Sequence, residues 1–135
     1  MRRFLAALSL LTLFTACGGD GSTDPTNASI AGTYTLRTVN GSPMPYTVTQ
    51  SGPYKYEITS DAYTLSDGGT WSEIRTYRTT SNEVVTTSTN PDGGTYSRNG
   101  TAITLVSPNS GAVSGSVANG TMTLTAEGFA LVFVK

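Results

Sequence analysis

The sequence has no histidine and a single cysteine, Cys17, among its 135 residues. Without these groups it cannot form a Ser-His-Asp triad, a Cys-His dyad, a Cys/His zinc site or a disulfide within the chain. Charged residues make up only 13% of the chain, and six Lys and Arg follow residue 17. So few basic residues argue against nucleic-acid binding. We therefore expect neither an enzyme nor a cofactor-dependent protein.

Long hydrophobic runs are also lacking, and the longest apolar stretch stands at the N-terminus. Arg2 and Arg3 precede an apolar segment over residues 4–14. This length suits the central region of a signal peptide and is shorter than the roughly 20 residues that span a bilayer. Two small residues and then Cys17 follow it. The pattern predicts a signal peptide over residues 1–17.

The residues that end this segment, Phe14-Thr15-Ala16-Cys17, resemble the lipobox of bacterial lipoproteins, with Phe14 in the place of the usual Leu. The resemblance implies that Cys17 is lipidated on sulfur and anchors the protein to a membrane. The alternative is an ordinary secretory signal with an incidental cysteine. Gly18, rather than Asp, follows the cysteine, which implies an outer-membrane location in the cell envelope, facing the periplasm or the surface.

Composition divides the remaining chain into a tether and one domain. Residues 18–29 are rich in Gly, Ser, Thr, Asp and Pro and are expected to form a flexible tether. Residues 30–135 have the length of a single domain. From Cys17 onward the chain carries six basic and nine acidic side chains.

The domain sequence predicts an all-β fold. It contains short β-branched and aromatic runs, 24 Thr in the whole chain, and frequent Asn-Gly and Asp-Gly pairs that favour tight turns. We expect an antiparallel up-and-down meander barrel of about 8–10 strands. The expected strands are 31–39, 45–50, 54–59, 62–66, 70–79, 83–89, 94–98, 101–107, 112–118, 121–126 and 129–134, with 54–66 open to being one bent strand.

Three of the expected turns predict a shared apolar face. Two-residue turns at Asn119-Gly120 and Glu127-Gly128 place Val117 and Leu124 opposite other apolar residues, Met122 and Leu131. They also pair Met122 with Phe133. A turn at Asn99-Gly100 places Tyr96 opposite Ile103. These independent assignments give one continuous surface for the core.

The turn at residues 67–69 allows two registers. A two-residue loop would bury Ile74 and point Trp71 outward. A three-residue loop, with Gly69 at positive φ, pairs Leu65 with Trp71 and turns Trp71, Glu73, Arg75 and Tyr77 inward. We favour the second register because it buries the single Trp, although two charged side chains then also face the interior.

The opening Gly32-Thr33-Tyr34 resembles the Gly-x-Trp signature of lipocalins and related calycin barrels. The longer segment from Gly32 to Pro45 and the threonine-rich end of the chain resemble small lipocalin-like bacterial lipoproteins of unassigned function. Tyr34 stands where lipocalins have Trp. The last strand carries no Arg to stack on that ring, and only Lys135 is near. The resemblance implies an up-and-down barrel of eight to ten strands.

The acidic residues give few catalytic candidates, because most fall on the tether or beside predicted turns. Glu57 and Glu73 lie mid-strand and are interpreted as charge partners of Lys55 and Arg75. The segment at residues 90–94 contains Asp and two Gly but lacks the spacing of a calcium loop, and we interpret it as a plain turn.

Two functions remain open. The first is a lipocalin-like binder of a small apolar ligand in the cell envelope, with Trp71, Glu73, Arg75 and Tyr77 as candidate ligand-binding residues and Arg75 as an anchor for a ligand headgroup. The second is a structural or inhibitor-like module with a filled core that binds an envelope protein. The expected partners are the membrane, through the N-terminal lipid, and either such a ligand or such a protein. No metal site is expected.

Overall fold

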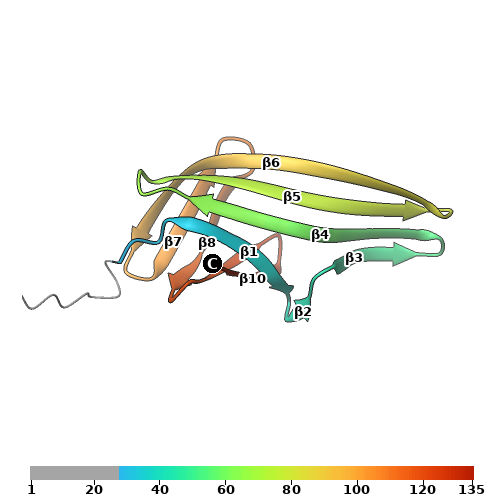
Figure 1. Ribbon diagram of the computed structural model, residues 1–135, viewed down its shortest axis with the longest axis horizontal. Coiled ribbons are helices and arrows are strands. Elements are labelled where there is room, and N and C mark those ends of the chain that lie inside the picture. The colour runs from blue at the N-terminus through green and yellow to red at the C-terminus, as the bar shows by residue number, and fades with distance from the viewer. Residues whose placement is uncertain (1–27) are drawn as a thin grey trace, which may run out of the picture.

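The computed structural model describes residues 28–135, so the predicted signal peptide, the lipidation at Cys17 and most of the tether lie outside the described residues. Ten β-strands form this part of the chain (Figure 1). They are β1 (Gly32–Val39), β2 (Ser42–Pro43), β3 (Tyr46–Ser51), β4 (Tyr54–Leu65), β5 (Thr70–Ser81), β6 (Val84–Asn99), β7 (Ala102–Ser107), β8 (Gly111–Ala118), β9 (Thr121–Ala126) and β10 (Phe129–Val134). None of the described residues forms a helix that could cross a membrane.

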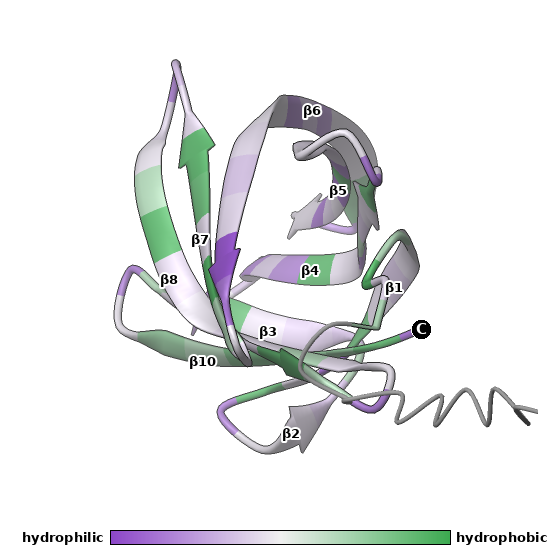
Figure 2. Cartoon of the chain, turned by 90° about the vertical axis from the view of Figure 1, so that its left-hand side faces the viewer, coloured by the Kyte–Doolittle hydropathy of each residue, from purple (hydrophilic) through white to green (hydrophobic). Residues whose placement is uncertain are grey.

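Eight of these strands close into an antiparallel up-and-down barrel. Neighbours along the chain pair from β4 to β10, β10 pairs with β1, and β1 closes the ring by pairing with the second half of β4. The end-on view in Figure 2 shows the strands around a common interior. The predicted all-β meander is confirmed, and the barrel is compatible with a lipocalin-like fold.

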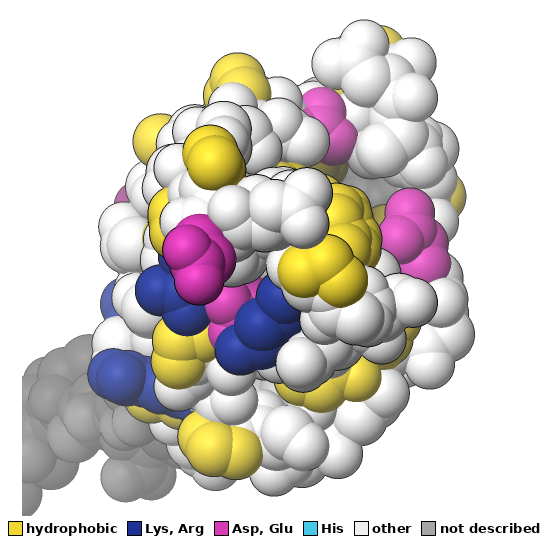
Figure 3. Space-filling view, turned by 90° about the vertical axis from the view of Figure 1, so that its right-hand side faces the viewer, with side chains coloured by type: hydrophobic (Ala, Val, Ile, Leu, Met, Phe, Trp, Pro, Cys, Tyr) yellow, Lys and Arg dark blue, Asp and Glu magenta, His cyan; other side chains and the backbone are white. Residues whose placement is uncertain are grey.

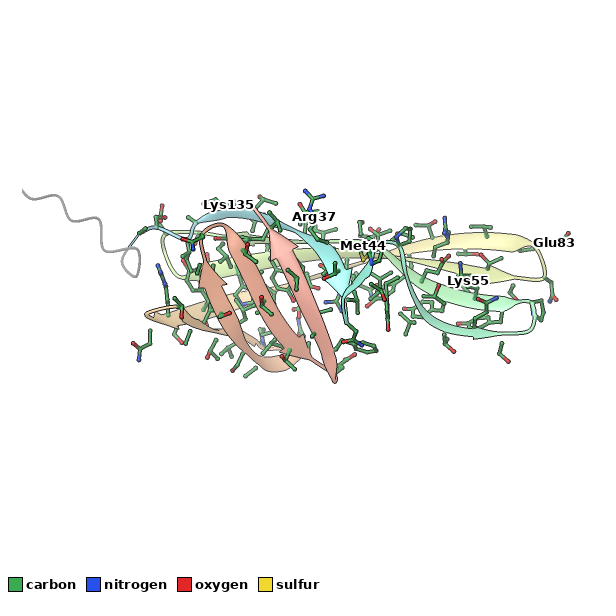
Figure 4. All side chains as sticks on the ribbon, turned by 90° about the horizontal axis from the view of Figure 1, so that it is seen from below. Arg37, Met44, Lys55, Glu83 and Lys135 are labelled. Atoms are coloured by element: carbon green, nitrogen blue, oxygen red, sulfur yellow. The ribbon has the colours of Figure 1, made fainter. Side chains whose placement is uncertain are left out.

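Three long strands carry the sheet beyond the barrel as an arm. The arm consists of β3 with residues 54–60 of β4, 76–81 of β5 and 84–89 of β6. It projects from one end of the barrel in Figure 1, and Lys55 and Glu83 lie on it in Figure 4, far from Lys135. The two predicted runs between residues 54 and 66 form one strand with a bulge between Ile58 and Ser60.

The plain turn predicted at residues 90–94 is wrong, because β6 continues through this segment. Residues 90–94 pair in register with residues 71–75 of β5. β7 joins the other side of β6 only from Thr95 onward, so within the described chain Pro91 lies where β6 has one strand neighbour. A proline without an N–H is tolerated at such an edge, and the following glycines let the strand bend into the barrel.

The hairpin predictions are confirmed at two turns and corrected at the third. Val117 pairs with Met122, and Leu124 pairs with Leu131, as expected for the turns at residues 119–120 and 127–128. Tyr96, however, pairs with Leu105 and not with Ile103. The turn residues are Gly100 and Thr101, because Gly100, at φ +60°, takes the first central position that type II′ turns reserve for glycine. The register moves by two residues, so the apolar face is unchanged.

The loop at residues 67–69 has three residues, and the inward register of β5 is confirmed. Leu65 pairs with Trp71, and Gly69 has a φ of +78°. Trp71 is 7% exposed, whereas Ile74 is 57% exposed. The Trp71 indole donates a hydrogen bond from Nε1 to the carbonyl of Thr95 at 2.9 Å.

The core fills the barrel interior away from the cavity and reaches Ile58 at the base of the arm. It comprises Tyr34, Leu36, Val39, Ile58, Tyr63, Leu65, Trp71, Ile103, Leu105, Val117, Met122, Leu124, Leu131 and Phe133. The Tyr63 ring packs at 5.3 Å from Trp71 and at 5.1 Å from Phe133. Lys135 lies with Nζ 5.8 Å from the Tyr34 ring centroid, so a cation and an aromatic ring meet at the barrel closure.

Candidate functional site

A cavity of about 610 Å³ opens at the end of the barrel from which the arm projects. Its walls come from β4, β5, β6, β8 and β9 and from the two turns at residues 108–110 and 127–128. The lining residues are Tyr63, Glu73, Arg75, Tyr77, Asn90, Pro91, Asp92, Asn109, Ser110, Ala112, Val113, Thr125, Ala126 and Glu127. Figure 3 looks at this end of the molecule, with the arm projecting toward the viewer. The barrel is thus packed at one end and hollow at the other.

A cluster of three charged side chains lies at this cavity. Arg75 donates from Nε to Asp61 Oδ2 at 2.8 Å and lies with NH2 2.8 Å from Glu73 Oε1. Its third nitrogen, NH1, is 3.5 Å from the hydroxyl of Tyr77. Asp61 is completely buried, and Glu73 is 8% exposed. Arg75 and Glu73 line the cavity, and Asp61 lies behind them.

The strand geometry explains why Asp61 joins this cluster. The bulge between Ile58 and Ser60 shifts the alternation of β4 by one residue, so that Asp61, Tyr63 and Leu65 face inward below it. Asp61 is then the direct cross-strand partner of Arg75. Sequence reasoning places Asp61 beside a turn and misses it as a site residue. Asp61 is two residues from Tyr63, and residues two apart on a strand lie on the same face, so this spacing could have indicated its inward direction.

The electrostatics of the cluster are unusual for a protein interior. Burial raises the pKa of Asp61 to about 7, since the attraction of Arg75 is offset by burial and by repulsion from Glu73. Among the described residues, Asp61 Oδ1 has no hydrogen-bond partner. Burial and the nearby Glu73 and Asp61 also raise the pKa of Tyr63. A buried carboxylate with one unpaired oxygen costs free energy and is a common mark of a functional site.

This shift makes stability pH-dependent. Because the folded protein holds the Asp61 proton where the unfolded chain has lost it, the free energy of unfolding should fall as pH rises between about 4 and 7. The slope has an upper limit of about 1.4 kcal/mol per pH unit. Urea unfolding at pH 5, 6, 7 and 8 measures it. In Asp61→Asn the slope should flatten, whereas Glu57→Gln should keep it, because the Lys55 and Arg78 partners lower the pKa of Glu57. An unchanged slope in Asp61→Asn would contradict the assignment.

The structure brings together three of the four predicted ligand-binding residues. Glu73, Arg75 and Tyr77 line the cavity. Trp71 lies deeper, in the core beneath Tyr63. The predicted role of Arg75 as a headgroup anchor meets an obstacle, because its guanidinium is already engaged by two carboxylates and approached by Tyr77.

A smaller apolar recess of about 190 Å³ adjoins the cavity. The two hollows share Arg75, Tyr77, Ala126 and Glu127. The remaining walls of the recess are mostly apolar: Val48, Tyr56, Ile58, Phe129 and Leu131. The Tyr56 ring stacks on Tyr77 at 5.1 Å, which fixes the boundary between the two hollows. Charged groups and an apolar pocket therefore lie side by side.

Asp92, on the opposite wall of the cavity, is a second residue that the sequence did not single out. Its carboxylate accepts hydrogen bonds from the hydroxyls of Ser107 and Ser110 at 2.8 and 2.7 Å and from the backbone N–H of Gly93 at 2.8 Å. These bonds, Ser110 foremost, lower its pKa. They fix the β7–β8 turn against β6. No group of three His, Cys, Asp or Glu side chains placed to hold a metal occurs within residues 28–135.

The pairing predicted for the two mid-strand glutamates is present. Glu57 lies 2.5 Å from Lys55 Nζ and 2.8 Å from Arg78 NH2 on the arm. Glu73 pairs with Arg75. Both carboxylates have little exposed surface, although the partners that cover Glu57, Lys55 and Arg78, are themselves 36% and 41% exposed. Glu57 forms ion pairs with two cations, whereas Arg75 is the shared ion-pair partner of two carboxylates.

Comparison with known proteins adds no relative: no family model, no curated protein and no solved structure matches the chain. The site is therefore interpreted from its own geometry.

Proposed function

We propose that the protein binds a small molecule in the cavity at the open end of its barrel. The observation that carries this proposal is a charged cluster at a hollow of about 610 Å³: the buried Glu73 and the partly exposed Arg75 line it, and the buried Asp61 pairs with Arg75 behind them. That volume is typical of small-molecule sites. Buried ion pairs seldom add net stability compared with apolar residues of similar size. A function in ligand recognition gives a reason for their presence.

The cavity favours this function over a module with a filled core. Tyr63 belongs to the packed core and also lines the cavity, and mainly polar residues of β5, β6 and the β7–β8 turn line the space in front of it. Backbone strands, rather than loops, carry Glu73, Arg75 and Tyr77, so their positions are held by a regular hydrogen-bonded sheet. We further propose that a lipid on Cys17 tethers this binding domain to an envelope membrane, on the strength of the lipobox-like sequence alone.

The binding proposal can be tested with the full chain and a neutral fluorescent probe, N-phenyl-1-naphthylamine. We expect saturable binding of about one probe per chain. Ala126→Phe should weaken it about ten-fold or more, because Ala126 lines both hollows and the added ring would occupy them. Ala130→Phe is the matched control, since Ala130 is exposed on β10.

The two variants separate the outcomes. Strong binding by the parent chain and by Ala130→Phe, with loss in Ala126→Phe, supports a site in the cavity. No saturable binding, or equal binding by all three proteins, would overturn it.

A further inference from the structure

The charge balance around the cavity identifies the class of ligand that it fits. At the inner end, one cation, Arg75, faces two carboxylates, Asp61 and Glu73. At the rim, Asp92 and Glu127 add two further acidic side chains to the lining. Arg75 is the one basic residue of that lining within residues 28–135. With all carboxyls ionised, the site has an excess of negative charge.

An anionic ligand is disfavoured here. Arg75 already balances two carboxylates, Asp61 and Glu73, so a ligand carboxylate would bring a third negative charge to a single guanidinium. Repulsion between these like charges makes such binding unfavourable. The sequence-based expectation of Arg75 as a headgroup anchor therefore gives way to a different role: it holds the two carboxylates in place.

A cationic ligand meets the opposite situation. Asp61 Oδ1 is buried and has no hydrogen-bond partner among the described residues. Asp61 shares the inward face of β4 with Tyr63, and it is paired across the sheet with Arg75. Both of these neighbours line the cavity. An ammonium group entering at Glu73 would donate hydrogen bonds to that carboxylate, and its positive charge would also offset the negative charge of Asp61 behind it.

The adjoining recess can hold an apolar part of the ligand. Ile58, Phe129 and Leu131 line it, next to the Tyr56–Tyr77 stack. An apolar body placed there is removed from water, which favours binding. The tyrosine faces at the boundary also attract cations.

We propose that the cavity binds a small organic amine: its ammonium group contacts Glu73, in front of the buried Asp61, and its apolar body occupies the recess beside Tyr77. This inference rests on the proposed function and narrows it from a small apolar ligand to an amphiphilic cation.

Proton linkage gives the proposal a second signature. Asp61 faces Arg75 and Glu73 from β5 and Tyr63 from its own strand, and Asp92 and Glu127 lie on the other cavity walls. Because burial raises the pKa of Asp61 to about 7, the site holds a proton at lower pH that an ammonium group would displace. Amine affinity should therefore rise between pH 6 and pH 8, a range in which a simple alkylamine stays protonated.

The experiment is calorimetric titration of the full chain at pH 8 with two matched probe sets. One set is 2-phenylethylamine, 2-phenylethanol and 3-phenylpropanoate, and the other is octylamine, octanol and nonanoate. In each set we expect the amine to bind about ten-fold or more tightly than the alcohol and the carboxylate. Asp61→Asn and Glu73→Gln should each remove that preference. Glu57→Gln, which alters an ion-paired carboxylate on the arm outside the cavity lining, should retain it.

The outcomes separate this inference from the proposed function. Equal or tighter binding of the alcohols or carboxylates, still blocked by Ala126→Phe, would overturn the amine assignment and leave a small-molecule site. The amine assignment also fails if N-phenyl-1-naphthylamine binds in the cavity but neither amine does, or if the amine preference survives both Asp61→Asn and Glu73→Gln. Failure of the dye and of all six probes would overturn the proposed function itself.

Discussion

Gly115→Ala should destabilise the domain by about 3 kcal/mol or more, although it adds a single methyl group. Gly115 lies on β8 between Ile103 of β7 and Leu124 of β9. A Cβ atom built there would overlap the backbone carbonyl of Thr123 and would lie 2.8 Å from a methyl of Leu124. A backbone carbonyl cannot rotate away as a side chain can, so the strand pairing itself would have to shift. Denaturant unfolding measures the loss.

The neighbouring residues provide the control for this prediction. Ser114 and Ser116 are exposed on the same strand, and their replacement by Ala should change the free energy of unfolding by no more than about 0.5 kcal/mol. A similarly small effect at Gly115 would mean that β8 and β9 do not approach each other as described. Gly94 gives an independent comparison, because a Cβ there would overlap the carbonyl of Val106.

Alternation and turn chemistry make most of the barrel predictable from sequence. The inward positions of Met122, Leu124 and Leu131 follow from alternation once the two turns between β8 and β10 are placed. Asn119 and Gly120 both adopt positive φ, as their residue types favour. The predicted strand register is wrong where a turn residue fits more than one turn type. Gly100 fits the second position of one hairpin turn and the first position of another.

The charged cluster is only half predictable for a different reason. The inward direction of Glu73 and Arg75 follows from the length of one loop, which the burial of Trp71 decides. The inward direction of Asp61 depends on a bulge in β4, which inserts one extra residue between Ile58 and Ser60. Neither of these residue types indicates a bulge in the sequence. Sequence patterns also cannot show that β5 and β6 run on past the barrel as an arm, because strand ends depend on which neighbours remain to be paired.

The substitution Asp61→Asn links stability to the proposed site. At pH 8 the ionised Asp61 is less favourable in the folded protein than in water, because burial raises its pKa. A neutral amide of the same shape can still accept the bond from Arg75, so this variant should be at least as stable as the parent chain. A stable fold that loses amine preference would be the behaviour of a recognition residue and not of a structural one.

Trp71→Ser should cost about 3–5 kcal/mol, whereas Ile74→Asp, three residues away on the same strand, should cost less than about 1 kcal/mol. The contrast follows from the register of β5. Trp71 is buried beneath Tyr63, so a serine there would leave a large void and would remove the hydrogen bond from the indole to the Thr95 carbonyl. Ile74 points outward, and an aspartate there meets water.

The pair of variants tests the site as well as the core. If β5 were turned over, Ile74→Asp would unfold the domain and Trp71→Ser would be tolerated. Glu73, Arg75 and Tyr77 would then face solvent, and the cavity would lose its charged wall. Denaturant unfolding of both variants distinguishes the two registers. The direction of Trp71 and the composition of the ligand site are consequences of the same three-residue loop at residues 67–69, so one measurement bears on both.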